Sequence, residues 1–564
     1  NLWRTNPIPE LGIPVLKVSD GPNGVRGDGG ASAASFPVGI CMGATWNPDL
    51  IKTLGVAIAE EAKTKEVQVV LGPTINLHRT PLGGRNFECY AEDPVLSGEL
   101  AAAFTQGVQS QGVGACLKHF VCNDSEFERH TISVEVDEQT LREVYLLPFQ
   151  IAIEKSSPWT IMAAYNRVNG VYACSHDELL NQVLKKEWGF EGLVISDWFA
   201  AKETLKNALG GLDLEMPGPS RVWGDALRQA VTDGLVPESV LDDKVRRLLR
   251  VLQWSGRLDS PTDAPERSVD IAEHRAVAYQ TAVEGMVLLK NEGVLPLARS
   301  SIQKLAVIGP NVRHFRVMGG GSSALKPHYI SAPLSALRER YPGMDVSAQT
   351  GCPTFKYIPE PERDLLTPAV DAGETLDDAA RGLRVRFYED VERTQLIRQR
   401  IISQSTVHAS LLAGAANAMT LDGEYLCETA GDYTFGLLST GRAKMRVDDE
   451  ILIDNWTAPQ PGDAFFMQGS TEVRGSRFFE AGKRIRVEIE FEVSADTMFK
   501  GLRYGILEPQ FLDPISEAVT LASASDACIL MVGTNDDWET EGNDRDSLSL
   551  PGAQDELIAR VLAV

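Results

Sequence analysis

One pattern repeats through the first 260 residues: a short apolar run ends in a polar or charged residue, and a helical segment follows. The six runs are residues 14–20, 67–76, 112–119, 159–166, 192–197 and 211–215. The segments between them, such as residues 138–156, carry helical patterns. Strands that alternate with helices form parallel sheets. Six such units favour a (β/α)₈ barrel over a short open sheet.

A barrel of this kind places its active site at the carboxyl ends of its strands. The polar residues that end the runs are therefore candidate site residues, although a residue at a strand end can also simply cap the next helix. They are Asp20, Asn76, Lys118, His119, Tyr165, Asn166, Asp197 and Glu215.

The rest of the chain changes character twice. Residues 257–270 are polar and contain proline, which is typical of a linker, and a helix is expected over 272–291. The apolar runs 304–310 and 526–533 are predicted to be parallel strands of one interrupted α/β domain. Between them, short alternating strands and glycine turns predict an all-β sandwich. The expected domains are 1–257 (barrel), 258–352 (linker and first part of the α/β domain), 353–510 (inserted sandwich) and 511–564 (second part of the α/β domain).

Composition excludes several classes of protein. The 564 residues contain 54 Lys and Arg against 78 Asp and Glu, which gives a net charge of −24. Such a charge repels nucleic acid and anionic membranes, so a neutral substrate is expected. The eight cysteines form no CxxC pair, and no metal site is predicted. No signal peptide is visible in the opening NLWRTNPIPELG, and both a cytoplasmic and a secreted or periplasmic location remain open.

Several motifs occur together in a fixed order. They are SDGPNGVRG (19–27), LGPTINLHRTPLGGRNFECYAEDP (71–94), LKHFVCNDSEFERH (117–130), GLVISDW (192–198), LLKNEGVLPL (288–297) and ETEGNDRDSLSLP (539–551). This set resembles the family-3 glycoside hydrolases, in particular the β-glucosidases. The stretches 431–454 and 481–491 resemble the protective-antigen-type β-sandwich found in some of these enzymes. Family members usually continue into a fibronectin-type domain.

The resemblance implies a retaining β-glucosidase that needs no cofactor. In such an enzyme one carboxylate attacks the anomeric carbon and a second donates and then accepts a proton. The family pattern assigns Asp197 as the nucleophile and Glu541 as the general acid/base, with Glu539 as the runner-up. It further implies contacts with the −1 sugar, the ring whose bond is cleaved, from Asp20, Arg85, Lys118, His119, Arg129, Met162, Tyr165 and Trp198.

Three further expectations concern this site. The cations near Asp197 should keep it ionised. The pKa of Glu541 should be raised so that this residue is protonated near neutrality. The site should lie between the barrel and the second domain, which supplies Glu541.

The motifs also bear on alternative functions. A β-N-acetylglucosaminidase of the same family is disfavoured because KHFVCNDSE stands where that subgroup has a KHFPGHG-type motif. A β-xylosidase, a natural-product deglycosylase and a non-catalytic carbohydrate-binding protein remain alternatives. A calcium loop centred on Gly542 is rejected because Leu548 stands where a bidentate glutamate is needed. The expected partners are β-glucosides and cello-oligosaccharides, and a homo-oligomer is left open.

Overall fold

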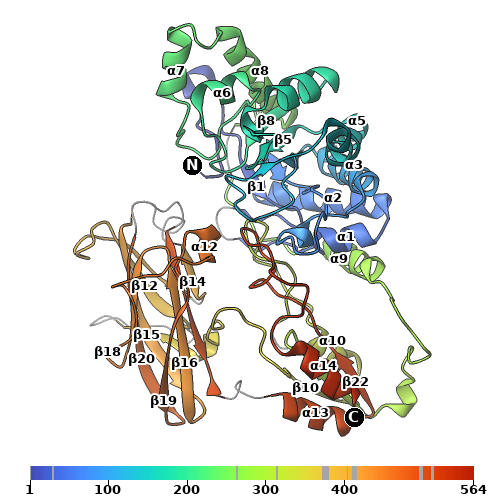
Figure 1. Ribbon diagram of the computed structural model, residues 1–564, viewed down its shortest axis with the longest axis vertical. Helices are drawn as coiled ribbons and strands as arrows, with labels where there is room; N and C mark the ends of the chain where they lie inside the picture. Colours follow the sequence, from blue (N-terminus) through green and yellow to red (C-terminus); the bar gives the residue numbers. More distant parts are fainter. Residues whose placement is uncertain are drawn as a thin grey trace. The chain divides into compact units, whose positions relative to one another are not determined.

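A computed structural model describes residues 2–27, 31–261, 264–312, 315–370, 380–402, 404–408, 416–493, 500–509 and 514–564 (Figure 1). The chain forms two compact units. Unit 1 comprises Asn1–Pro296, Arg316–Ser331 and Glu539–Leu548, and unit 2 comprises Leu297–Phe315, Ala332–Trp538 and Ser549–Val564. The segment that carries Glu541 therefore folds with the first 296 residues and not with its neighbours in the sequence. The domain boundaries at 257, 352 and 510 stay predictions.

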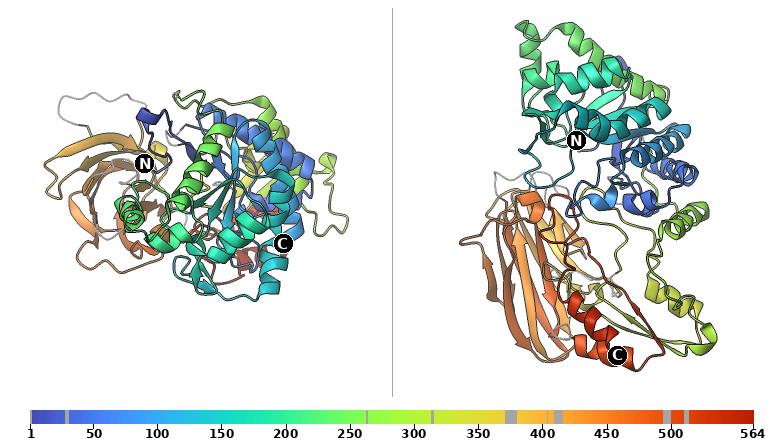
Figure 2. Two further views of the ribbon diagram at one scale, coloured as in Figure 1. Left: turned by 90° about the horizontal axis from the view of Figure 1, so that it is seen from above. Right: turned by 45° about the vertical axis from the view of Figure 1, so that its right-hand side comes forward.

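A curled sheet of five parallel strands forms the centre of unit 1, with its strands in the order β1-β2-β3-β5-β8. These strands are β1 (Val18–Asp20), β2 (Val69–Leu71), β3 (Gly114–Phe120), β5 (Thr160–Ala163) and β8 (Leu193–Ser196). Helices pack beside one another along the sheet (Figure 2), among them α2 (Pro48–Thr64), α3 (Pro94–Ser110) and α5 (Leu147–Ser156). α5 lies within residues 138–156, for which a helical pattern was expected, and α2 and α3 lie between apolar runs, where helical segments were expected.

The eight-stranded barrel predicted from the sequence is not confirmed. Of the run 211–215, only Leu214 joins the sheet, through a single parallel bridge to Ile195. The following residues, Met216-Pro-Gly-Pro219, contain two prolines, which cannot donate to a ladder of hydrogen bonds. From there the described chain continues as helices rather than strands. The described residues of unit 1 thus form a half-barrel.

The remaining elements of unit 1 are short helices and small strands. They are η1 (Pro9–Leu11), α1 (Gly39–Ala44), η2 (Asn86–Glu88), β4 (Ser133–Val134), α4 (Glu138–Thr140), η3 (Leu141–Tyr145), β6 (Arg167–Val168), β7 (Val171–Tyr172), η4 (Ala173–Ser175), η5 (Glu178–Glu187), α6 (Thr204–Leu209), α7 (Asp225–Thr232), α8 (Glu238–Trp254) and α9 (Ala272–Gly285). The helix expected over 138–156 is thus divided among α4, η3 and α5.

The helix expected over 272–291 was predicted too long. It ends at Gly285, and Met286 already has extended backbone angles. Beyond it, the Asn291 side chain donates to the carbonyl of Leu295 and accepts from its amide, which closes a local turn that competes with a helix. Leu289, in this segment, is 91% exposed.

Close helix contacts in unit 1 depend on glycine. A Cβ atom on Gly55 of α2 would lie 2.4 Å from the carbonyl oxygen of Phe104, and one on Gly107 of α3 would lie 2.1 Å from that of Lys52. The backbones of α2 and α3 therefore approach more closely than any side chain would permit.

Unit 2 contains a parallel sheet in the order β10-β9-β22. β9 (Lys304–Ile308) and β22 (Ala527–Leu530) both belong to this parallel sheet, as expected from the sequence, and they are direct neighbours although more than 200 residues separate them. The strand β10 (Asp345–Gln349) and the helices η6 (Arg299–Ser301), α10 (Pro333–Arg340), α13 (Ile515–Ser523) and α14 (Gln554–Leu562) complete this part.

Two antiparallel sheets occupy the stretch for which short alternating strands were expected. In β20, Ile485, Val487, Ile489 and Phe491 are buried and charged residues stand between them, which is the period of a strand with one face in a core. The first sheet contains β11 (Leu366–Pro368), β12 (Leu383–Tyr388), β13 (Leu396–Ile402), β15 (Ala418–Cys427), β17 (Arg442–Val447), β18 (Glu450–Asn455) and β20 (Lys483–Glu492). The second contains β14 (Thr406–His408), β16 (Gly431–Ser439), β19 (Val473–Phe479) and β21 (Gly501–Leu507); η7 (Arg363–Leu365) and α12 (Ala464–Met467) accompany them. The likeness to a protective-antigen-type domain stays a prediction.

None of the helices in the described ranges is both long and apolar enough to span a bilayer.

A buried charged cluster joins α9 to α2. The ring of His274 is hydrogen-bonded through Nδ1 to Glu61, at 3.0 Å, and through Nε2 to Glu60, at 2.8 Å. Glu61 also accepts a bond from Lys65 at 3.1 Å. Although burial lowers the pKa of His274, the two carboxylates raise it overall above its usual value.

We predict that replacing His274 with glutamine costs more stability in acid than in alkali. A raised histidine pKa gives stabilisation that is complete below the pKa of the unfolded chain, about 6.5, and is lost as the pH rises through the folded-state value. The measurement is thermal unfolding of wild type and His274→Gln between pH 5.5 and 9. His78, whose pKa is lowered by burial, is the control, since His78→Gln should show the opposite trend. A destabilisation by His274→Gln that did not change with pH would contradict the prediction.

Candidate active site

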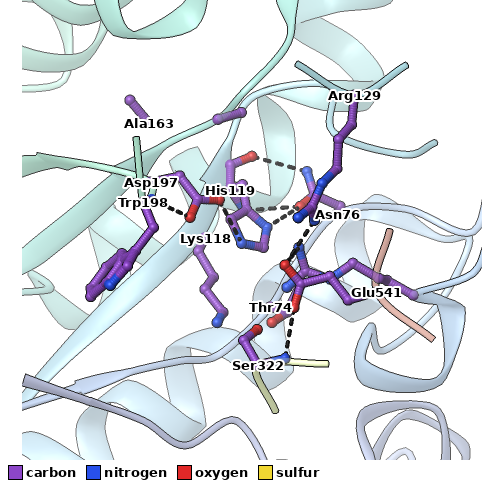
Figure 3. Close-up of polar contacts among 12 residues, drawn as sticks. Thr74, Asn76, Lys118, His119, Arg129, Ala163, Asp197, Trp198, Ser322 and Glu541 are labelled. Carbon is purple, nitrogen blue, oxygen red and sulfur yellow. Dashed lines mark hydrogen bonds and ion pairs between the residues drawn. The ribbon is translucent and has the colours of Figure 1, made fainter. Parts of the chain in front are cut away.

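Three strands of the half-barrel end in polar side chains at one edge of the sheet. Asp20 is the last residue of β1, Lys118 and His119 lie near the end of β3, and Asp197 directly follows β8. Because parallel strands share one carboxyl edge, these residues converge, and Figure 3 shows Lys118, His119 and Asp197 close together. All four are buried.

The two carboxylate oxygens of Asp197 have different surroundings. Its Oδ1 accepts a bond from the amide of Trp198 at 2.7 Å, and its Oδ2 lies 3.4 Å from Nε2 of His119. Burial raises the pKa of Asp197 to about 6, against the lowering effect of Arg85 and Arg129. The cations therefore lower this pKa as expected, but burial outweighs them, so that Asp197 is mostly and not wholly ionised near neutrality in the free protein.

His119 is fixed by a single asparagine in the segment that follows the neighbouring strand β2. Asn76 Oδ1 accepts from the amide of His119 at 2.9 Å and lies 3.2 Å from its Nδ1. Asn76 Nδ2 donates to the His119 carbonyl at 3.0 Å. Burial, followed by the charges of Arg85 and Lys118, holds the pKa of His119 well below its usual value.

Asp20 lies between two cations. Lys118 Nζ is 3.8 Å from its Oδ1, and Arg26 Nη1 is 3.9 Å from its Oδ2. Burial raises the pKa of Asp20 even so. This arrangement offers both an acceptor and a donor to the hydroxyls of a neutral sugar.

Glu541 reaches the same site from far along the chain. Its Oε1 lies 2.7 Å from Arg129 Nη1 and 3.8 Å from Arg85 Nη1, and its Oε2 accepts from the amide of Ser322 at 2.7 Å. Burial alone would raise its pKa, but Arg85 and Arg129 hold that pKa well below the usual range. The expected raised pKa is therefore wrong for the free protein. The location between domains is also corrected, because Glu541 and Asp197 belong to the same compact unit.

Both arginines bind a second carboxylate. Arg129 Nη1 is 2.9 Å from Glu126 Oε2, and Arg85 pairs with Glu88. Glu126 Oε2 also accepts from the amide of Gly542 at 2.7 Å, next to Glu541. Sequence reasoning missed Glu88 and Glu126, although each stands three residues from its arginine partner, a spacing that could have suggested both ion pairs.

The loop at 319–323 supplies the Ser322 amide that binds Glu541. Gly321 has φ +94°, and a Cβ atom on it would lie 2.3 Å from that of Glu541. Only glycine allows this approach. No local sequence signal connects positions 219 residues apart.

Asp544 fixes the loop that carries Glu541. Its Oδ1 accepts from the amide of Gly84 at 2.9 Å. Its Oδ2 accepts from the Ser125 hydroxyl at 2.6 Å and from the amides of Glu126 and Phe127 at 2.9 and 3.0 Å. Glu539, the other candidate acid, is half-buried, and its carbonyl accepts from the amide of Gly320.

The remaining predicted sugar contacts have distinct surroundings. Tyr165 lies beneath Arg129, whose Cζ is 4.6 Å from the ring centroid. Trp198 packs against Trp3 with centroids 5.2 Å apart. Met162 is 2% exposed and belongs to the hydrophobic core of the sheet.

Two of the strand-end candidates make backbone contacts of a structural kind. Asn166 Nδ2 donates to the carbonyls of Val121 and Arg167. The Glu215 carboxylate accepts hydrogen bonds from the amides of residues 221–223 and so stabilises the loop between them. As for metals, the described residues contain no group of three or more His, Cys, Asp or Glu side chains that could hold an ion.

The chain is similar to known proteins over its whole length. The model of the glycosyl hydrolase family 3 N-terminal domain matches residues 5–251, and that of the family's C-terminal domain matches residues 286–564. A β-glucosidase of Rhizobium radiobacter is 40% identical over 100% of this chain and 68% of its own length, and a probable β-glucosidase I of Emericella nidulans is 37% identical over 100% and 69%.

Solved structures show the same likeness. A β-glucosidase of Kluyveromyces marxianus in complex with glucose has a TM-score of 0.93 at 32% identity, covering 100% of this chain and 69% of that one. DesR, a β-glucosidase of Streptomyces venezuelae in complex with D-glucose, has a TM-score of 0.71 at 31% identity, covering 100% and 67%. Together with the two matched domains, these likenesses show that the chain belongs to glycosyl hydrolase family 3, whose members are enzymes that hydrolyse glycosides.

Proposed function

We propose that this chain is a retaining β-glucosidase that removes terminal, non-reducing β-D-glucosyl residues from β-glucosides and cello-oligosaccharides. The observation that carries the proposal is a pair of buried carboxylates, Asp197 and Glu541, within the electrostatic reach of the same two arginines. The names of the relatives and the glucose bound in two similar structures support glucose as the sugar.

The two carboxylates have separate tasks in this mechanism. Asp197 lies at the base of the site, where it attacks the anomeric carbon and forms a covalent glycosyl ester as the aglycone leaves. Glu541 lies on a loop and protonates the departing oxygen, then removes a proton from the water that hydrolyses the ester. Asp20 and Lys118 hold the sugar hydroxyls, which orients the ring for attack.

The free site does not yet have the protonation that this reaction needs. Glu541 is ionised and paired with arginines, while the Asp197 pKa of about 6 leaves part of that carboxyl protonated near neutrality. Two interacting carboxylates such as Asp197 and Glu541 titrate as a pair. Which of the two carries a bound proton depends on the groups that contact each of them. The sugar, by donating hydroxyl protons to Asp197, would stabilise the nucleophilic carboxylate and leave the proton for Glu541.

We predict that Asp197→Ala lowers kcat on aryl β-glucosides by a factor on the order of 10⁴ to 10⁶ and leaves the circular dichroism spectrum unchanged. A 2-deoxy-2-fluoro glucoside with a good leaving group should inactivate the wild type by labelling Asp197, as peptide mass spectrometry would show. The exposed Asp225 on α7 is the matched control, and Asp225→Ala should behave like the wild type. A label on any other residue would refute the nucleophile assignment.

The pKa of Asp197 predicts an acid limb in the pH profile of kcat/KM. The attacking form is ionised, so kcat/KM should fall about tenfold for each pH unit below about 6. A dinitrophenyl β-glucoside is the substrate of choice because its leaving group hardly needs protonation. A profile that stays flat down to pH 4.5 would show that Asp197 is ionised in the free enzyme.

We predict that Glu541→Ala slows cellobiose hydrolysis by on the order of 10² to 10⁴ and spares the glycosylation step of dinitrophenyl glucoside. Added azide should restore turnover and give β-glucosyl azide, because a small anion can occupy the space of the missing carboxylate and needs no base. Glu539→Ala is the matched control, two residues away on the same loop. If azide rescued Glu539→Ala instead, Glu539 would be the acid/base.

A panel of aryl β-glycosides separates the proposed function from its rivals. The highest kcat/KM should be on the glucoside. Preference for the xyloside would identify a β-xylosidase, preference for a glycosylated natural product a deglycosylase, and binding without hydrolysis a carbohydrate-binding protein.

A further inference from the structure

The orientation of the Asn76 amide follows from two backbone groups. A peptide N–H can only donate and a peptide carbonyl can only accept. The amide of His119 lies 2.9 Å from Asn76 Oδ1, and the carbonyl of His119 lies 3.0 Å from Asn76 Nδ2. If the Asn76 amide were flipped, its NH₂ group would face the N–H of His119 and its oxygen would face the carbonyl of His119, and neither pair could form a hydrogen bond. Asn76 Oδ1 is therefore an acceptor that points at residue 119.

The same oxygen decides the tautomer of the His119 ring. Nδ1 lies 3.2 Å from Asn76 Oδ1, which has no proton to give, so Nδ1 carries the hydrogen. His119 is 2% exposed, and Arg85 and Lys118 act on it as positive charges that oppose a second proton. The ring is thus neutral, and its Nε2 bears a lone pair.

That lone pair faces another acceptor. Nε2 lies 3.4 Å from Oδ2 of Asp197, and this oxygen is buried with no hydrogen-bond partner among the described residues. The second oxygen, Oδ1, is occupied by the amide of Trp198. Two facing acceptors are stable only with a proton between them. In the free protein the carboxyl group of Asp197 can supply it, and in the complex a hydroxyl group can.

We propose that Asn76 is a positioning residue that locks His119 as the Nδ1-protonated tautomer, so that Nε2 accepts a hydrogen bond from a sugar hydroxyl. The sugar hydroxyl must then donate the hydrogen bond to His119 Nε2, and a group that can only accept cannot replace it. The statement about the tautomer concerns the free protein alone, whereas the statement about the sugar rests on the proposed function.

The tautomer is measured directly by nitrogen NMR of the full chain labelled with ¹⁵N-histidine. His119, assigned by its absence in His119→Gln, should show a protonated Nδ1 and an unprotonated Nε2. His274, whose two nitrogens both face carboxylates, is the internal control and should show both nitrogens protonated at pH 6. A protonated Nε2 on His119 would overturn the proposal, and this measurement needs no catalytic activity.

The role of Asn76 is tested against a matched asparagine. Asn76→Ala should mix the two tautomers of His119 and lower kcat/KM by about tenfold, the effect of one lost hydrogen bond. Asn166 is the matched control because its amide is equally buried, follows β5 and donates only to backbone carbonyls. Asn166→Ala should therefore leave the tautomer of His119 unchanged. If Asn76→Ala kept the single tautomer, the lock would lie elsewhere.

The direction of the hydrogen bond to the sugar is tested with modified substrates. Removal of the hydroxyl that contacts His119 should lower kcat/KM about tenfold in the wild type and much less in His119→Gln, which identifies that hydroxyl. Replacing that hydroxyl by fluorine, which accepts but cannot donate, should be as damaging as removing it. A fluorinated substrate that recovered the lost rate would show that Nε2 donates. If no glycoside were hydrolysed at all, the proposed function would fail and the NMR result would stand.

Discussion

Two buried arginines hold the two parts of the active site together. Arg129 bridges Glu126 and Glu541, and Arg85 pairs with Glu88 and approaches Glu541. A charge removed from water is stable only when it is paired, and removing one partner leaves the other uncompensated. The loop 539–548 is thereby bound to the half-barrel, which is why it belongs to unit 1 although its sequence neighbours do not.

The same pairing moves the pKa values of the two carboxylates in opposite directions. Glu541 contacts both arginines and therefore has a lowered pKa. Asp197 is influenced by the same cations from farther away, and burial prevails, so its pKa is raised to about 6. The sequence correctly indicated that cations surround the site. It could not show which carboxylate they touch, since that depends on ångström distances between residues hundreds of positions apart.

Residues at the ends of parallel strands were predictable because strand ends meet at one edge whatever the details of the fold. Lys118, His119 and Asp197 were found in this way, and the family motifs added Arg85, Arg129 and Glu541. The same rule also selected Asn166 and Glu215, whose side chains bind backbone instead. Ser322 and Gly321 lie in a loop whose importance arises only from its contact with Glu541. The eight-stranded barrel failed where two prolines interrupt the sheet, a local signal that the count of apolar runs overlooked.

A general acid on a loop must be held in place, and the loop that carries Glu541 is fixed within its own compact unit. Three residues downstream, Asp544 accepts four hydrogen bonds from the half-barrel. With Asp544 bound in this way and Glu541 itself bound by Arg129 and the Ser322 amide, the backbone at Glu541 has little conformational entropy to lose when substrate binds.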